Sequence, residues 1–93
     1  MPNASEVISF FESIASKWCC ERVHNTAHEE TYLIRFDNDK YLGEIVYWSR
    51  GILRLECIMT NSGKTLFMED PYQIVSDDYK AHINEFLAKH DFL

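Results

Sequence analysis

The chain begins with an apolar pattern that fits one face of a helix. Between residues 4 and 18, apolar side chains recur every three or four positions, which is the spacing of an amphipathic helix. Asn3 is a suitable N-cap, and Glu6 three residues later completes a start like a capping box. The pattern predicts a helix with Lys17 in its last turn and an apolar stripe of Val7, Phe10, Phe11, Ile14 and Trp18.

The pattern then changes to a period of two. Tyr32, Ile34 and Phe36 alternate with other residues, and β-branched and aromatic types are frequent from there to Met68, as in strands. Because short links join antiparallel neighbours, this region predicts a four-stranded meander. A weaker strand could precede it near Cys20–His24, although 24–30 also reads as a loop. We expect turns at Asp37-Asn38-Asp39, Ser49-Arg50-Gly51 and Asn61-Ser62-Gly63.

A second helical pattern closes the chain. Pro71 ends the last strand or confines it to an edge, and Ser76 is a suitable cap for the helix that follows. Charges at both ends suit the helix dipole, with Asp77 and Asp78 in the first turn and Lys89 and His90 in the last. The apolar stripe of this helix is Tyr79, Ile83, Phe86 and Leu87.

The order helix, meander, helix defines the expected fold class. It predicts an α+β domain with an N-terminal helix, a sheet of four antiparallel strands (five with the weaker one) and a C-terminal helix, both helices on one face. A chain of 93 residues has no room for a second core. We therefore expect a single domain over residues 1–93.

The two faces of this sheet differ in composition. One is almost wholly apolar and should lie under the helices: Tyr32, Ile34, Phe36, Ile45, Tyr47, Leu53, Leu55, Cys57, Leu66 and Met68. The other mixes charges with large apolar groups: Thr31, Leu33, Arg35, Leu42, Glu44, Val46, Trp48, Ile52, Arg54, Glu56, Ile58, Phe67 and Glu69. A solvated face is mostly polar, whereas apolar patches edged by charges mark interaction surfaces. Unless residues 22–30 or 70–75 fold over it, or the registers are shifted, this face predicts a protein-binding surface.

Charge narrows the class of partner. The net charge is −6, which argues against nucleic acid and anionic membrane surfaces, since these need stripes of Lys and Arg. It permits a basic protein partner, because opposite potentials speed and orient encounter. A second explanation for the net charge of −6 is that the acidic residues only keep the protein soluble.

Targeting signals and disulfides are not evident. Three cysteines, two of them adjacent, are a poor disulfide framework. The first residues lack the basic region of a signal peptide. The longest unbroken apolar run is four residues, 45–48, far short of a membrane span. We expect a cytoplasmic protein.

Apparent ligand-binding motifs fail on spacing. Gly63-Lys64-Thr65 resembles the end of a phosphate-binding loop, but Ile58 stands where the loop needs glycine and a strand follows instead of a helix. Four residues have the right types for zinc, yet adjacent cysteines leave no two-residue turn between ligands. They are Cys19, Cys20, His24 and His28.

Catalytic pairs are equally weak. Cys57 falls on the apolar face, where a buried thiol is inert, and His82 and His90 have no obvious acid partner in the sequence. The acids cluster at turns and helix starts, where capping and solubility explain them. We expect no catalytic residue, no metal and no cofactor.

The segment after the first predicted strand has further motifs. Residues 40–64 contain Tyr41-Leu42-Gly43, a strand ending in Trp48-Ser49 with Gly51 close behind, and a Leu-Glu-x-Ile strand that runs into a Ser-Gly-Lys turn. With the acidic-aromatic segment and amphipathic helix that follow, this order resembles the TriTu-type immunity proteins of bacterial polymorphic-toxin systems. The resemblance covers about residues 31–90.

The resemblance implies a binder without its own chemistry. Members of that family bind and neutralise a cognate ADP-ribosyltransferase toxin directed at elongation factor Tu, in the cytoplasm of the producing cell. The mixed face would then dock on the toxin's catalytic domain, with Trp48 as an anchor. The predicted partner-binding residues are Trp48, Glu44, Arg54, Glu56, Phe67, Glu69, Asp70 and Tyr72.

Two other functions remain open. A secretion chaperone or adaptor would also be small and acidic, but its effector would be active once released. A small-ligand or enzymatic domain would use the concave side of the sheet and would carry a bound ligand or metal.

Overall fold

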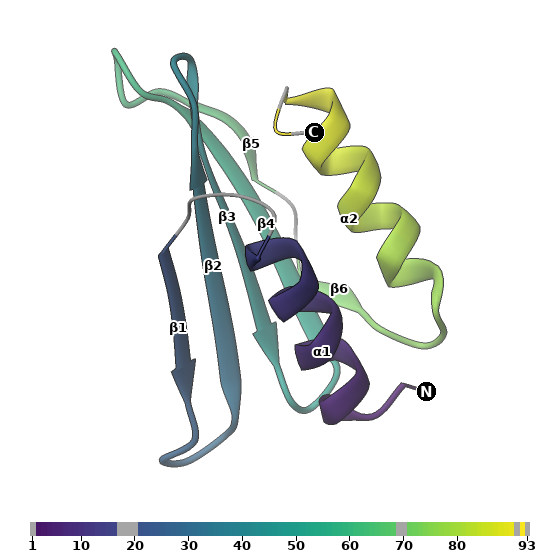
Figure 1. The fold of residues 1–93 in the computed structure, drawn as a ribbon. Coiled ribbons are helices and arrows are strands. Elements are labelled where there is room, and N and C mark those ends of the chain that lie inside the picture. Colours follow the sequence, from purple (N-terminus) through teal and green to yellow (C-terminus); the bar gives the residue numbers. More distant parts are fainter. Residues whose placement is uncertain (1, 17–20, 69–70, 91, 93) are drawn as a thin grey trace.

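The computed structural model describes residues 2–16, 21–68, 71–90 and 92, with Leu66 and Phe67 described by their backbone alone. Two helices pack on the same side of one antiparallel sheet (Figure 1), which confirms the α+β class. The elements in chain order are α1 (Ala4–Ala15), β1 (Glu21–Asn25), β2 (Thr31–Asp37), β3 (Tyr41–Trp48), β4 (Ile52–Met59), β5 (Thr65–Met68), β6 (Tyr72–Gln73) and α2 (Asp78–Lys89).

Helix α1 starts as its cap predicts. The Oδ1 of Asn3 accepts a hydrogen bond of 2.9 Å from the backbone N–H of Glu6, which satisfies one of the free amides of the first turn. Val7, Phe11 and Ile14 are buried, and the ring of Phe11 contacts Tyr32 and Tyr47 of the sheet. The predicted Lys17 and Trp18 lie outside the described residues.

Helix α2 begins one residue later than predicted. Its N-cap is Asp77, and Ser76 contributes only a 3.4 Å hydrogen bond from the N–H of Asp78 to its Oγ. Lys89 lies in the last turn as expected. The stripe of Tyr79, Ile83, Phe86 and Leu87 is buried against the sheet.

Within the described residues, no helix is long and apolar enough to cross a membrane.

The sheet has the predicted meander and two additional strands. Strands β1 to β5 lie side by side in chain order, all antiparallel, so the weaker strand of the sequence forms as β1. Strand β6 was not predicted. It pairs Gln73 with Ile52 and Tyr72 with Leu53 at the start of β4. Pro71 directly precedes this short strand, so its missing N–H removes no hydrogen bond between the strands.

The turns follow the predicted residues. Gly51 and Gly63 have φ values of 95° and 71°, a left-handed conformation that glycine adopts without steric cost. The Oδ1 of Asn38 accepts hydrogen bonds from the N–H groups of Lys40 and Tyr41 at 2.9 and 2.8 Å. Gly63 leads into β5, which confirms a hairpin turn at Gly63-Lys64-Thr65.

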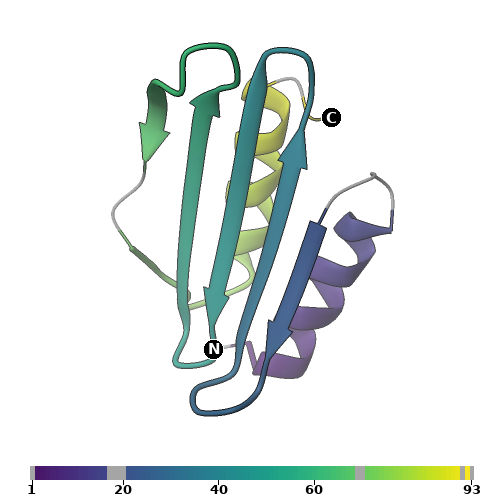
Figure 2. The same cartoon turned by 90° about the vertical axis from the view of Figure 1, so that its left-hand side faces the viewer.

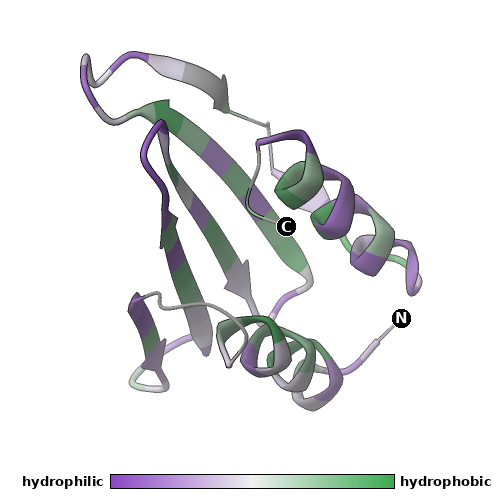
Figure 3. Ribbon diagram, turned by 45° about the horizontal axis from the view of Figure 1, so that its top comes forward, coloured by the Kyte–Doolittle hydropathy of each residue, from purple (hydrophilic) through white to green (hydrophobic). Residues whose placement is uncertain are grey.

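The core lies between the helices and the predicted apolar face. Hydrophobic and hydrophilic residues alternate along the central strands (Figure 3). The aromatic ring of Phe92 closes one end of the core, since a Cβ placed on Gly43 would come within 2.8 Å of it. The residues of this face that are at most 3% exposed are Tyr32, Ile34, Phe36, Ile45, Tyr47, Leu53, Leu55 and Cys57.

The assignment of Met68 to the apolar face was wrong. Met68 is 49% exposed and pairs with Glu56 on the opposite face. The cause is a bulge between Cys57 and Ile58. If the pairing of Ile58 with Thr65 continued without the bulge, Met68 would face Leu55 as predicted. A shift of one residue exchanges the faces of a strand.

Candidate functional site

The face of the sheet turned away from both helices is here called the open face. None of the described segments lies over its central strands (Figure 2). The two segments that could have covered it do not. Residues 21–25 extend the sheet as β1, and residues 72–73 pair along the edge of β4. On β2, β3 and β4 the open face is formed by Leu33, Arg35, Leu42, Glu44, Val46, Trp48, Ile52, Arg54, Glu56 and Ile58, and the neighbouring strands add Glu21 and Met68.

Strand register arranges this face in rows. The central row crosses five strands and is mostly charged: Glu21, Arg35, Glu44, Glu56 and Met68. An apolar pair flanks it on each side, Leu33 with Val46 and Leu42 with Ile58. These apolar side chains are half-buried, because neighbours on the same face shield one another. The face therefore combines fixed charges with accessible apolar area.

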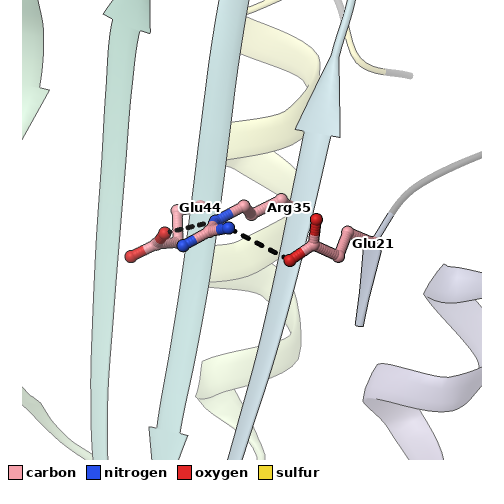
Figure 4. Close-up of polar contacts among 3 residues, drawn as sticks. All are labelled: Glu21, Arg35 and Glu44. Atoms are coloured by element: carbon pink, nitrogen blue, oxygen red, sulfur yellow. Dashed lines mark hydrogen bonds and ion pairs between the residues drawn. The ribbon is translucent and has the colours of Figure 1, made fainter. Parts of the chain in front are cut away.

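Arg35 organises the charged row. Its Nη1 lies 3.0 Å from Oε1 of Glu21, and its Nε lies 3.0 Å from Oε2 of Glu44 (Figure 4). The hydrogen bond to Glu44 and the charges of both carboxylates raise the pKa of Arg35 above its ordinary value. Exposed ion pairs add little stability, but this network fixes the positions of three charges. The predicted site omitted Arg35 and Glu21, although Arg35 stands on the mixed face in the sequence.

Glu56 and Arg54 lie next to this network without joining it. Glu56 stands directly opposite Glu44 on the neighbouring strand. Across the described residues, no basic side chain is paired with Glu56, and no carboxylate with Arg54. The Nη2 of Arg54 lies 3.1 Å from the sulfur of Met68. Both charges are available to a partner.

Trp48 lies at the end of β3 on the same face. It is half-buried and pairs with Thr31 and Ile52. The guanidinium of Arg50 lies 5.9 Å from the centre of its ring, within the range of a cation–π contact. Arg50 is itself paired with Glu29. Trp48 is thus pre-positioned at one border of the open face.

Of the remaining predicted site residues, only Tyr72 has a described side chain, and it lies away from the open face. Tyr72 pairs with the buried Leu53 and stacks on His82 of α2, with ring centres 4.5 Å apart, so it lies on the helix side. Phe67 is described by its backbone alone, which pairs with Cys57. Glu69 and Asp70 lie outside the described residues.

Two of the described groups with potential chemical reactivity, Cys57 and His90, are buried. Burial raises the pKa of the Cys57 thiol, which is fully enclosed in the core, so the reactive thiolate is disfavoured. His90 is buried, with Nδ1 3.0 Å from the carbonyl oxygen of Phe86. In the described segments, no three His, Cys, Asp or Glu residues could hold a metal ion. Cys19 and Cys20 lie outside them.

These features define a small α+β domain whose sheet is covered on one face and bare on the other. The family model of the immunity protein TriTu matches residues 8–89, which include most of α1, every strand and α2. The chain belongs to this family, as the motifs of residues 40–64 predict. Membership assigns it an immunity function and implies a cognate toxin as its partner. No curated protein matches the chain.

Proposed function

We propose that this protein neutralises an ADP-ribosyltransferase toxin by covering its catalytic domain with the open face. The observation that carries the proposal is the bare sheet face, with a fixed charged row between two apolar pairs. Family membership supplies the toxin as partner. The resemblance of residues 40–64 supports the ADP-ribosyltransferase class of this toxin.

The mode of inhibition is steric and needs no catalysis by the immunity protein. A sheet loses little conformational freedom on docking, so more of the contact energy appears as affinity. Leu33, Val46 and Trp48 would supply apolar contact, while Glu44 and Glu56 would meet basic groups that otherwise handle NAD phosphates or the target. Binding takes place in the cytoplasm of the producing cell, where the toxin would act.

Co-expression with the toxin tests the face directly. Val46→Arg together with Trp48→Ala places a charge in one apolar pair and removes the anchor. Cells producing this variant should lose protection, and purified toxin should regain ADP-ribosyl transfer from labelled NAD. Glu12→Lys on the exposed side of α1 is the matched control and should protect like wild type.

Two outcomes would contradict the proposal. If the double variant is folded and protects fully, another surface binds the toxin. If the wild-type protein binds the toxin but leaves its transferase activity intact, the protein acts as a chaperone or adaptor. Thermal unfolding of each variant separates lost binding from lost folding.

A further inference from the structure

The charged row on the open face alternates in sign and then stops alternating. Glu21, Arg35 and Glu44 are joined by two ion pairs of 3.0 Å. The next residue of the row is Glu56, directly opposite Glu44 on the adjacent strand. Directly opposed side chains in an antiparallel pair have Cβ atoms about 4.5–5.5 Å apart, and like charges there are destabilising. The row thus contains a place where a cation would be favourable.

The described part of the chain does not supply that cation. Its basic side chains on this face are Arg35, which is held by Glu21 and Glu44, and Arg54, whose guanidinium lies against Met68. Neither bridges Glu44 and Glu56.

Covering the open face would make the missing cation between Glu44 and Glu56 energetically costly. The side chain of Glu44 is only 29% exposed in the free protein, and Glu56 is half-buried. Leu42 and Ile58 flank the two carboxylates on one side. Val46 and Arg54 flank them on the other, with the Arg54 guanidinium against the sulfur of Met68. A partner that docks on these apolar residues removes water from both carboxylates, and a charge that loses water without gaining a partner is strongly unfavourable.

We propose that the toxin inserts an arginine side chain between Glu44 and Glu56. This inference rests on the proposed function, because it names what the open face receives. A guanidinium can donate to two carboxylates at once, as Arg35 does to Glu21 and Glu44 through Nη1 and Nε. It is also weakly hydrated and tolerates the apolar flanks better than a lysine ammonium does. The inserted arginine completes the alternation of charge along the row.

The test uses the full-length protein and the purified toxin domain of the co-expression assay. Glu56→Gln keeps the shape of the side chain and removes its charge. It should raise the Kd for the toxin by about 30-fold or more, the usual size of the effect when a desolvated charge pair loses one member. Glu12→Gln, on α1, should leave the Kd unchanged.

Stability of the free variant gives a measurement without the toxin. Because Glu56→Gln relieves the repulsion from Glu44, it should raise the unfolding midpoint by about 1–6 °C. The same substitution therefore stabilises the free protein and weakens the complex, an opposition that a general folding defect cannot produce. An unchanged or lower unfolding midpoint would contradict the proposed repulsion between Glu44 and Glu56.

Double-mutant cycles identify the arginine itself. Each arginine of the toxin domain is changed to alanine, and its effect on the Kd is measured against wild type and Glu56→Gln. One arginine should lose most of its effect in the Glu56→Gln background. If no toxin arginine couples to Glu56 while Val46→Arg still abolishes binding, the open face docks the toxin but receives no arginine. If the Val46→Arg variant also binds the toxin normally, both the inserted arginine and the proposed function of the open face are wrong.

Discussion

At the scale of single residues, the core contains a polar group without a visible role. The hydroxyl of Tyr79 is buried and has no hydrogen-bond partner within the described residues. The ring itself is well packed, with Phe10 in an edge-to-face contact at 5.7 Å. A buried hydroxyl that has lost water and gained no partner lowers the stability of the native state. The ring of Tyr79 therefore stabilises the fold, whereas its oxygen does not.

Replacing Tyr79 by phenylalanine should stabilise the protein. The change keeps the ring and removes the unsatisfied hydroxyl, so the free energy of unfolding should rise by about 1 kcal/mol. Urea denaturation followed by fluorescence measures it. Tyr79→Leu, which removes the ring contact with Phe10, should be destabilising. A loss of stability in Tyr79→Phe would mean that the hydroxyl does have a partner.

Stability should decline in alkaline solution. Desolvation by burial raises the pKa of Tyr79 above its ordinary 10.0, and Asp77 and Glu6 raise it further. Burial likewise raises the pKa of Cys57 above 9.0. Above these ordinary values the unfolded chain has released protons that the native state retains, so stability is complete below about pH 9 and falls as the pH rises.

Unfolding midpoints measured from pH 7 to pH 11 check this decline. The advantage of Tyr79→Phe over wild type should grow above about pH 10, because the variant lacks one of the responsible groups. A constant difference between the two proteins over this range would show that Tyr79 does not contribute.

At the scale of elements, the sequence predicts what local chemistry determines. Asn3 and the apolar spacing define α1, and the turn residues around Gly51 and Gly63 separate β3, β4 and β5. Pairing between strands was less predictable. Strand β6 exists only through its contact with β4, and the face of Met68 depends on a bulge that no residue pattern marks.

The candidate site shows the same division. The alternation along β3 and β4 placed Glu44, Trp48, Arg54 and Glu56 on the open face correctly. Tyr72 follows Pro71 in a segment without periodicity, and the structure places it beside α2. The ion pairs of Arg35 depend on strand register. The sequence does not show which residues face each other across neighbouring strands, so these ion pairs could not be predicted from it.

The bulge between β4 and β5 can be tested by substitution. Met68→Gln should change the free energy of unfolding by less than about 0.5 kcal/mol, because the side chain is half exposed. Leu55→Gln, which buries an amide in the core, should cost about 3 kcal/mol or more. Without the bulge, both substitutions would be similarly destabilising. Chemical denaturation of the two variants distinguishes these registers.

At the scale of the whole molecule, the two layers formed by the described residues leave one sheet face without cover. Both helices and Phe92 pack on the same side of the sheet, and the apolar side chains of the open face on β2 to β4 are half-buried. The network of Glu21, Arg35 and Glu44 keeps this face charged as well as apolar. The fold therefore presents a preformed sheet surface of mixed apolar and charged character.

The net charge should govern how fast the protein associates with the toxin. With a net charge of −6, we expect the protein to attract a basic surface on the toxin over a distance that salt shortens. Stopped-flow association with the toxin domain should slow by about tenfold or more between about 0.05 and 0.5 M salt. Val46→Arg should act mainly on dissociation, because it damages contacts that form after encounter. An association rate that is independent of salt would show that the acidity serves solubility and does not steer the toxin toward the open face.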